Sequence, residues 1–208
     1  MMNIQTQILD RIRQGGRGKV FTPKDFLDLG GREAVDQALS RLAKAGDIQR
    51  LGRGLYHFPR KNARLGIPLS PDTDEIASAL ARQTGTRIAP SGATAANRLG
   101  LSTQVPAKAV YLTDGRSRRV RVGNMDFVVK HVAPRDFPAG SRTSATVFQA
   151  LRYLGRGAVN PQVIARIRRN LPAKDRARLV QDSRYATDWI AETARLIADI
   201  KTEAAANG

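Results

Sequence analysis

Residues 19–58 constrain the fold more than any other part of the chain. They read KVFTPKDFLDLGGREAVDQALSRLAKAGDIQRLGRGLYHF and predict helices over 23–29 and 32–45, separated by Gly30-Gly31. Thr22 before Pro23 is typical of a helix start, and paired glycines permit a sharp turn. A period of 3.6 residues predicts one buried face for the second helix, formed by Val35, Ala38, Leu39 and Leu42.

A β-hairpin is predicted directly after these helices. Residues 48–51 are predicted to form a strand and residues 55–58 a returning strand, with Gly52-Arg53-Gly54 as a tight basic tip between them. Two helices at a glycine turn followed by such a hairpin are typical of a winged helix-turn-helix, whose second helix enters the DNA major groove. The alternative is a small α+β packing unit whose charged side chains are only solvated.

On the DNA-binding interpretation, the polar face of the second helix reads the duplex. Gln37 can bridge an adenine edge and Arg41 a guanine edge, while lysines and the hairpin arginines hold phosphates. The residues expected to contact DNA are Lys24, Arg32, Gln37, Ser40, Arg41, Lys44, Arg50 and Arg53.

The charge balance favours a polyanionic partner. The 208 residues include 35 Lys and Arg against 18 Asp and Glu, a formal net charge of +17. Nucleic acid is the commonest partner of so basic a domain. Because cysteine is absent, disulfides and thiolate metal sites are excluded. No apolar run approaches the length of a membrane span, and the N-terminus lacks a signal-peptide core, so we expect no membrane partner and a cytoplasmic protein.

The remaining chain predicts an α+β fold with a second, larger domain. The proline-rich stretch 61–71 has no period and is expected to link a DNA-binding domain, 1–60, to a C-terminal domain, 72–208. This second domain is expected to be mixed α/β, with a small antiparallel sheet and a helical last third. Strands are predicted over 86–89, 108–113, 118–122 and 125–132, and helices over 4–14, 72–83, 92–99, 143–153, 161–169, 172–181 and 185–201.

The three strands at 108–132 are expected to be successive antiparallel neighbours and to carry a second basic surface. Alternation puts Arg119 and Arg121 on one face, with Val120 and Val122 on the other. This surface could bind RNA or DNA phosphates or an acidic protein, or it could be a solvated outer face. Its candidate residues are Arg116, Arg118, Arg119, Arg121 and Lys130.

Catalytic chemistry is not predicted. The only histidines, His57 and His131, lie in different predicted strands and domains, so neither a metal site nor an acid–base pair is indicated. Ser91 lacks the spacing of a nucleophile elbow and is expected to cap a helix. The loop before Val20 lacks the Ser or Thr of a phosphate-binding loop. We therefore expect no enzyme, no metal and no cofactor.

Three runs of the sequence resemble a known family. They are GRGKVFTPKDFLDLGGREAVDQALSRLAKAGDIQRLGRGLYHFP, LSPD and RIAPSGATAANRLGLSTQVPAKAVYLTDGRSRRVRVG, and with their surroundings they cover roughly residues 8–156. The chain resembles the AbiEi-type antitoxins of bacterial type IV toxin–antitoxin systems.

The resemblance implies a bipartite protein. Its winged helix-turn-helix would repress its own operon at inverted repeats, and its C-terminal domain would counter a cognate nucleotidyltransferase toxin of the AbiEii type. In that family the N-terminal domain carries DNA binding, which here falls on the face of Gln37, Ser40, Arg41 and Lys44, with Lys24, Arg50 and Arg53. The alternatives are a stand-alone transcriptional regulator, an RNA-binding accessory protein that uses the strands around 116–121, and a nucleic-acid enzyme.

Overall fold

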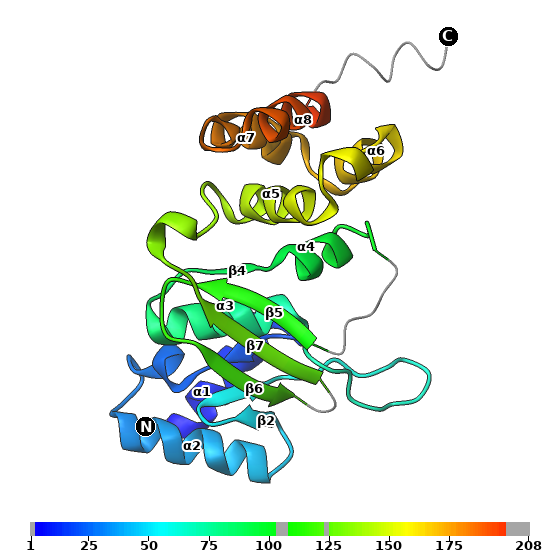
Figure 1. Cartoon of the computed structure of the whole chain (residues 1–208). Coiled ribbons are helices and arrows are strands. Elements are labelled where there is room, and N and C mark those ends of the chain that lie inside the picture. The colour runs from blue at the N-terminus through cyan, green and yellow to red at the C-terminus, as the bar shows by residue number, and fades with distance from the viewer. Residues whose placement is uncertain (1–2, 103–107, 123–124, 199–208) are drawn as a thin grey trace. The chain divides into compact units, whose positions relative to one another are not determined.

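The structure is a computed structural model and describes residues 3–102, 108–122 and 125–198. Its helices and strands, most of which are labelled in Figure 1, confirm the α+β fold class. The chain divides into two compact units. Residues 1–88, 107–109 and 115–129 form the first, and residues 89–106, 110–114 and 130–208 form the second. Among the described residues, no helix combines the length and the apolar character needed to cross a bilayer.

The first unit begins with three helical segments and a small sheet. The sheet has the antiparallel order β1-β3-β2, in which Val20 pairs with His57 and Arg50 with Tyr56. The predicted elements are all present, and the bounds are α1 (Ile4–Gly15), β1 (Val20–Phe21), the 3-10 helix η1 (Pro23–Phe26), α2 (Arg32–Lys44), β2 (Gln49–Gly52) and β3 (Leu55–His57).

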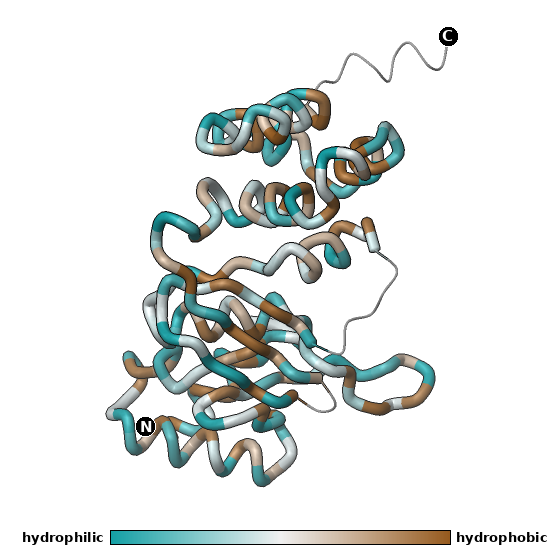
Figure 2. The backbone as a smooth tube through the Cα atoms, viewed as in Figure 1, coloured by the Kyte–Doolittle hydropathy of each residue, from teal (hydrophilic) through white to brown (hydrophobic). Residues whose placement is uncertain are grey.

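One apolar cluster holds these elements together. The four residues predicted to form the buried face of α2 are all buried, and hydrophobic residues alternate with hydrophilic ones along this helix in Figure 2. They pack against Ile8 and Ile12 of α1 and against Phe26. Tyr56 and Phe58 reach the same cluster from the hairpin, because residues two apart on a strand share a face.

The helix predicted over 23–29 is shorter in the structure. It is a single 3-10 turn, Pro23–Phe26, because only seven residues separate Thr22 from Gly30 and the chain turns again at Leu27. Thr22 is the N-cap, but its hydroxyl donates to the Asp25 carboxylate (3.2 Å), which also accepts the Thr22 backbone N–H (2.9 Å). Arg11 then binds both carboxylate oxygens of Asp28, at 2.7 and 2.8 Å. The turn before α2 is thus fixed by side chains.

Helix α3 (Thr73–Thr84) belongs to the first unit rather than the second. Lys19 Nζ pairs with Glu75 Oε1 at 2.8 Å, and Arg82 Nε pairs with Asp25 Oδ1 at 2.9 Å. Arg82 also donates to the Val20 carbonyl at 3.0 Å. The first unit therefore extends beyond the predicted linker at 61–71.

The second sheet has the order β4-β5-β7-β6. Its strands are β4 (Ile88–Pro90), β5 (Lys108–Thr113), β6 (Arg118–Val122) and β7 (Met125–His131), close to the predicted bounds. The expectation of three successive neighbours was wrong, because β5 lies beside β7 rather than β6. Strands β6 and β7 form the antiparallel pair, with Arg118 opposite Val129. Gly123 and Asn124, predicted to form the turn between them, lie outside the described residues.

The second unit is mainly helical. Its helices share one apolar core, in which Leu151, Ile167, Ile190 and Ile197 are fully buried. The predicted final helix, 185–201, begins later, at Asp188, after the 3-10 turn η4 (Ser183–Tyr185), and its end lies outside the described residues. The helix bounds are α4 (Gly92–Arg98), α5 (Arg142–Leu154), α6 (Pro161–Asn170), α7 (Ala173–Asp182) and α8 (Asp188–Ala198), with the 3-10 turns η2 (Pro134–Asp136) and η3 (Arg156–Ala158).

Candidate nucleic-acid interface

The polar face of α2 is open to solvent. Gln37 and Arg41 are exposed and lie one helical turn apart on the side opposite the buried Val35 and Leu39. Arg32 and Lys44 are also exposed near the two ends of the helix, and Ser40 is half-buried. Of the eight residues expected to contact DNA, these five therefore share one helix, and four are freely accessible.

The β2–β3 hairpin presents two further arginines. Arg53 is exposed at the tip, where Gly54 has a φ of +66°, a conformation that favours glycine. Arg50 is exposed on β2, and its Nε donates to the Gly52 carbonyl at 3.4 Å. Lys24, the eighth candidate, is exposed on η1. All eight sequence-predicted residues thus reach solvent in the first unit.

A cavity of about 390 Å³ lies between α2 and the hairpin. We call it the arginine pocket. It carries four guanidinium groups and a single carboxylate, so an anion is the ligand that its charge favours. It is lined by Arg32, Asp36, Ser40, Arg50, Arg53, Gly54, Tyr56, Gln83 and Arg118.

Two of its lining residues connect the hairpin tip to other elements of the first unit: Gln83, which the sequence did not single out, and Arg118, which was expected on the second basic surface. Arg118 donates to Gln83 Oε1 at 2.8 Å and to the Arg53 carbonyl at 3.4 Å, while Gln83 Nε2 donates to the Gly54 carbonyl at 3.4 Å. These bonds anchor the hairpin tip to α3 and β6. Strand alternation predicts that Arg118 shares a face of its strand with Val120 and Val122. Nothing in the sequence, however, indicates which element packs against that face.

Tyr56 and Asp36 also line the arginine pocket. Asp36 pairs with Arg32 at 2.8 Å along the helix. Burial raises the pKa of the Tyr56 hydroxyl, which Arg50 opposes and the Asp36 carboxylate reinforces. The hydroxyl is therefore protonated at neutral pH and can donate a hydrogen bond to an anionic oxygen.

The second basic surface predicted on the strands is only partly assembled. Arg119 and Arg121 share a face as predicted, but both approach the Asp126 carboxylate on the neighbouring strand, Arg121 at 4.0 Å. Hydrogen bonding from Arg119 holds the pKa of Asp126 below its ordinary value, so this acid remains ionised and offsets part of the positive charge. Including Arg118 in this surface was wrong, because Arg118 lies on the opposite face. Arg116 and Lys130 are exposed, and Lys130 belongs to the second unit.

A family profile matches residues 7–180, which include α2, the hairpin, Arg118 and the helices up to α7. The chain belongs to the DUF6088 family. This is a family of unknown function. A comparison with curated proteins gives no match.

The DUF6088 chain shows no metal-binding constellation, because no three His, Cys, Asp or Glu side chains cluster suitably within the described residues. His57 is buried on β3 and His131 is exposed on β7. Ser91 is the N-cap of α4 as expected, although its hydroxyl makes no capping hydrogen bond and instead donates to Thr94 Oγ1 at 3.5 Å. The arginine pocket and the exposed face of α2 are therefore the candidate binding site in the described part of the chain.

Proposed function

We propose that this DUF6088 protein is a sequence-specific duplex-DNA-binding regulator that represses its own operon. The observation that carries the proposal is the exposed Gln37–Arg41 face of α2 beside the arginine pocket. In the first unit, the elements follow one another as α1, β1, η1, α2, β2 and β3, an order that supports the proposal of a winged helix-turn-helix. This order supports α2 as the helix that enters the major groove and the hairpin as the wing.

The proposed contacts are of two kinds: contacts to base edges, which specify the sequence, and contacts to backbone phosphates, which position the protein. Gln37 presents an amide that suits an adenine edge, and Arg41, one turn further along the helix, presents a guanidinium that suits a guanine edge. The arginine pocket would hold backbone phosphates next to the groove, with the Arg118 side chain already fixed in place by its hydrogen bonds to Gln83 Oε1 and to the Arg53 carbonyl. Fixing the Arg118 side chain in advance lowers the entropy cost of binding.

The antitoxin part of the proposal rests on the sequence resemblance. On this proposal, a dimer of the chain would bind inverted repeats in its operator, and the second unit would neutralise a cognate nucleotidyltransferase toxin in the bacterial cytoplasm. Co-expression with a nucleotidyltransferase encoded in the neighbouring reading frame tests this. Growth restored by the full chain supports neutralisation, and growth arrest that the chain does not relieve contradicts it.

DNA binding is tested by fluorescence anisotropy with the full chain. The probes are a duplex from upstream of its own gene, a scrambled duplex and an RNA of the same sequence. Tighter binding to the upstream duplex supports the regulator, whereas preference for the RNA would favour an RNA-binding accessory protein. Equal affinity for all three would contradict sequence-specific regulation.

Adjacent arginines of β6 provide a matched pair of variants. Arg118→Gln removes one cation from the arginine pocket. The loss of one charged hydrogen bond should lower the affinity for both duplexes about tenfold. Arg119→Gln removes the same charge from the opposite face and should leave both affinities nearly unchanged. Equal effects of the two variants would show that the pocket does not hold phosphates.

A further inference from the structure

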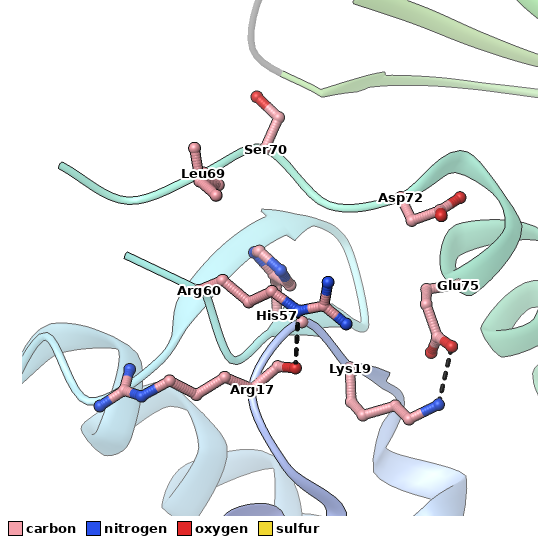
Figure 3. Close-up of a pocket in the computed structure, with 9 residues that line it drawn as sticks. Arg17, Lys19, His57, Arg60, Leu69, Ser70, Asp72 and Glu75 are labelled. Carbon is pink, nitrogen blue, oxygen red and sulfur yellow. Dashed lines mark hydrogen bonds and ion pairs between the residues drawn. The ribbon is translucent and has the colours of Figure 1, made fainter. Parts of the chain in front are cut away.

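A second cavity in the first unit has no part in the proposed DNA interface. It has a volume of about 240 Å³ and lies among the loop before β1, the end of β3 and the start of α3 (Figure 3). We call it the histidine cavity. The lining residues that matter here are Arg17, Lys19, His57, Arg60, Asp72 and Glu75.

His57 is the unusual member of this lining. Its side chain is 1% exposed, and within the described residues neither ring nitrogen has a hydrogen-bond partner. Strand alternation explains its position: Tyr56 and Phe58 pack into the core that contains α2, so His57 lies on the other face of the sheet. Buried polar atoms are almost always paired, so a polar side chain left in this state beside a cavity points to a missing partner.

The protonation of His57 limits what that partner can be. Burial lowers the pKa of the imidazole, against a smaller opposing effect of Glu75, so the ring is neutral at pH 7. A neutral imidazole has one N–H donor and one acceptor nitrogen. It can therefore donate a hydrogen bond to an anionic oxygen without adding a further charge to the cavity.

Arg60 supplies a cation that is already positioned at the cavity and is accessible to a ligand. Its Nε donates to the Arg17 carbonyl at 3.2 Å, and its terminal amino groups have no partner among the described residues. Gly18 makes this placement possible, because a Cβ there would lie 2.6 Å from Arg60 Nε. In Figure 3 the Arg60 side chain extends across the cavity next to His57, with its guanidinium toward Lys19 and Glu75.

The other charged groups of the cavity are already occupied. Lys19 Nζ pairs with Glu75 Oε1 at 2.8 Å, and the Asp72 carboxylate caps α3 by accepting the Asp74 N–H at 2.8 Å. Arg17 turns its guanidinium onto the Phe58 ring, 4.5 Å from the ring centre. The donors that remain available to a ligand are therefore the exposed terminal amino groups of Arg60 and the buried, unpaired imidazole of His57.

We propose that the histidine cavity binds a small molecule through a carboxylate or phosphate group, whose oxygens accept hydrogen bonds from Arg60 and His57. The volume is below that of a typical drug-sized pocket, about 300–1,000 Å³, which limits the ligand to a small metabolite. Three cations against two carboxylates favour a singly charged group.

Imidazole NMR resonances of the full chain test this directly. The chain has only two histidines, so in a His131→Gln background the only imidazole signal comes from His57. Inorganic phosphate and acetate, each matched against chloride at equal ionic strength, serve as probes. A saturable shift of the His57 resonance, with a rise in its pKa, is the expected result. A shift with phosphate alone would identify a phosphate group, and a shift with acetate would identify carboxylate recognition.

Two variants separate the cavity from general charge effects. Arg60→Gln should weaken the apparent affinity about tenfold, the loss expected for one charged hydrogen bond. Arg64→Gln, an exposed arginine of the same segment that does not line the cavity, should leave it unchanged. No saturable shift with either anion, or equal affinity in the two variants, would overturn the proposal. The affinity for DNA is measured in a separate assay, so the anion-binding proposal can fail without affecting the DNA-binding proposal, and the reverse.

Discussion

The Asp25 carboxylate stabilises the turn before α2 through four hydrogen bonds. It accepts from the backbone and hydroxyl of Thr22 at 2.9 and 3.2 Å, and from Arg82 at 2.9 and 3.2 Å. Loss of the capping interaction should cost about 1 kcal/mol. The ion pair is partly exposed, with side-chain exposures of 46% for Arg82 and 20% for Asp25, so about 0.5–1 kcal/mol is appropriate for it. Asp25→Ala should therefore lower the free energy of unfolding by about 2 kcal/mol.

Urea unfolding followed by far-UV circular dichroism measures this effect, and a double-mutant cycle with Arg82→Gln isolates the ion pair. The coupling energy should be about 0.5–1 kcal/mol. Asp10→Ala, which removes an exposed carboxylate 3.9 Å from Arg13, is the control and should cost less than about 0.5 kcal/mol. Trp189, the only tryptophan, packs in the second unit, so its fluorescence follows that unit separately. A coupling energy near zero, or a loss for Asp25→Ala no larger than the control, would refute the reasoning.

Three further perturbations test other parts of the structure. Burial alone would raise the pKa of Asp182, but the Ser141 N–H (2.8 Å) and Arg178 (3.2 Å) hold this pKa below its ordinary value. The ionised Asp182 therefore adds to the free energy of unfolding above the unfolded pKa of about 3.9, and this stabilisation is lost as the pH falls through the folded pKa. Asp182→Asn should thus lower stability at neutral pH and flatten its decline below about pH 4, which urea midpoints across the acid range would reveal. Arg53→Gln should reduce the slope of log affinity against log salt by about 0.9, whereas an unchanged slope would mean that the wing tip does not touch phosphate. Leu39→Ala, at a fully buried position, should cost about 2–5 kcal/mol in the same unfolding assay, and a neutral effect would contradict the α2 core.

Local patterns in the sequence predicted the elements well. The apolar spacing of α2 identified its buried residues, and Asn160 before Pro161 identified the start of α6, where the Asn160 side chain accepts the Val163 N–H at 3.0 Å. These features depend on residues within one or two helical turns of each other. Physical rules for periodicity and capping therefore suffice to find them.

Long-range contacts could not be predicted in this way. The pairing of β7 with β5, and of Arg118 with Gln83, joins residues that no local pattern relates. The attachment of α3 to the first unit depends on Arg82 reaching Asp25, 57 residues away. A proline-rich stretch resembled a domain boundary because its composition shows where regular structure stops, not where compact units divide.

His57 shows a further limit of sequence reasoning. Its type and position indicated only that it lacks the neighbours of a metal site. Its significance depends on being buried with both ring nitrogens unpaired beside Arg60, which follows from the packing of the sheet.

The proposed regulator requires that the exposed face of α2 read DNA bases. The most direct measurement is the ratio of affinities for the upstream and scrambled duplexes, compared among the wild-type chain, Gln37→Ala, Arg41→Ala and the control Arg13→Ala, which removes an exposed arginine from α1. The two α2 variants should each lose about 1–3 kcal/mol on the upstream duplex and much less on the scrambled one, so that the ratio falls. The control should keep the wild-type ratio. Equal losses on both duplexes for Gln37→Ala and Arg41→Ala would contradict base reading by α2.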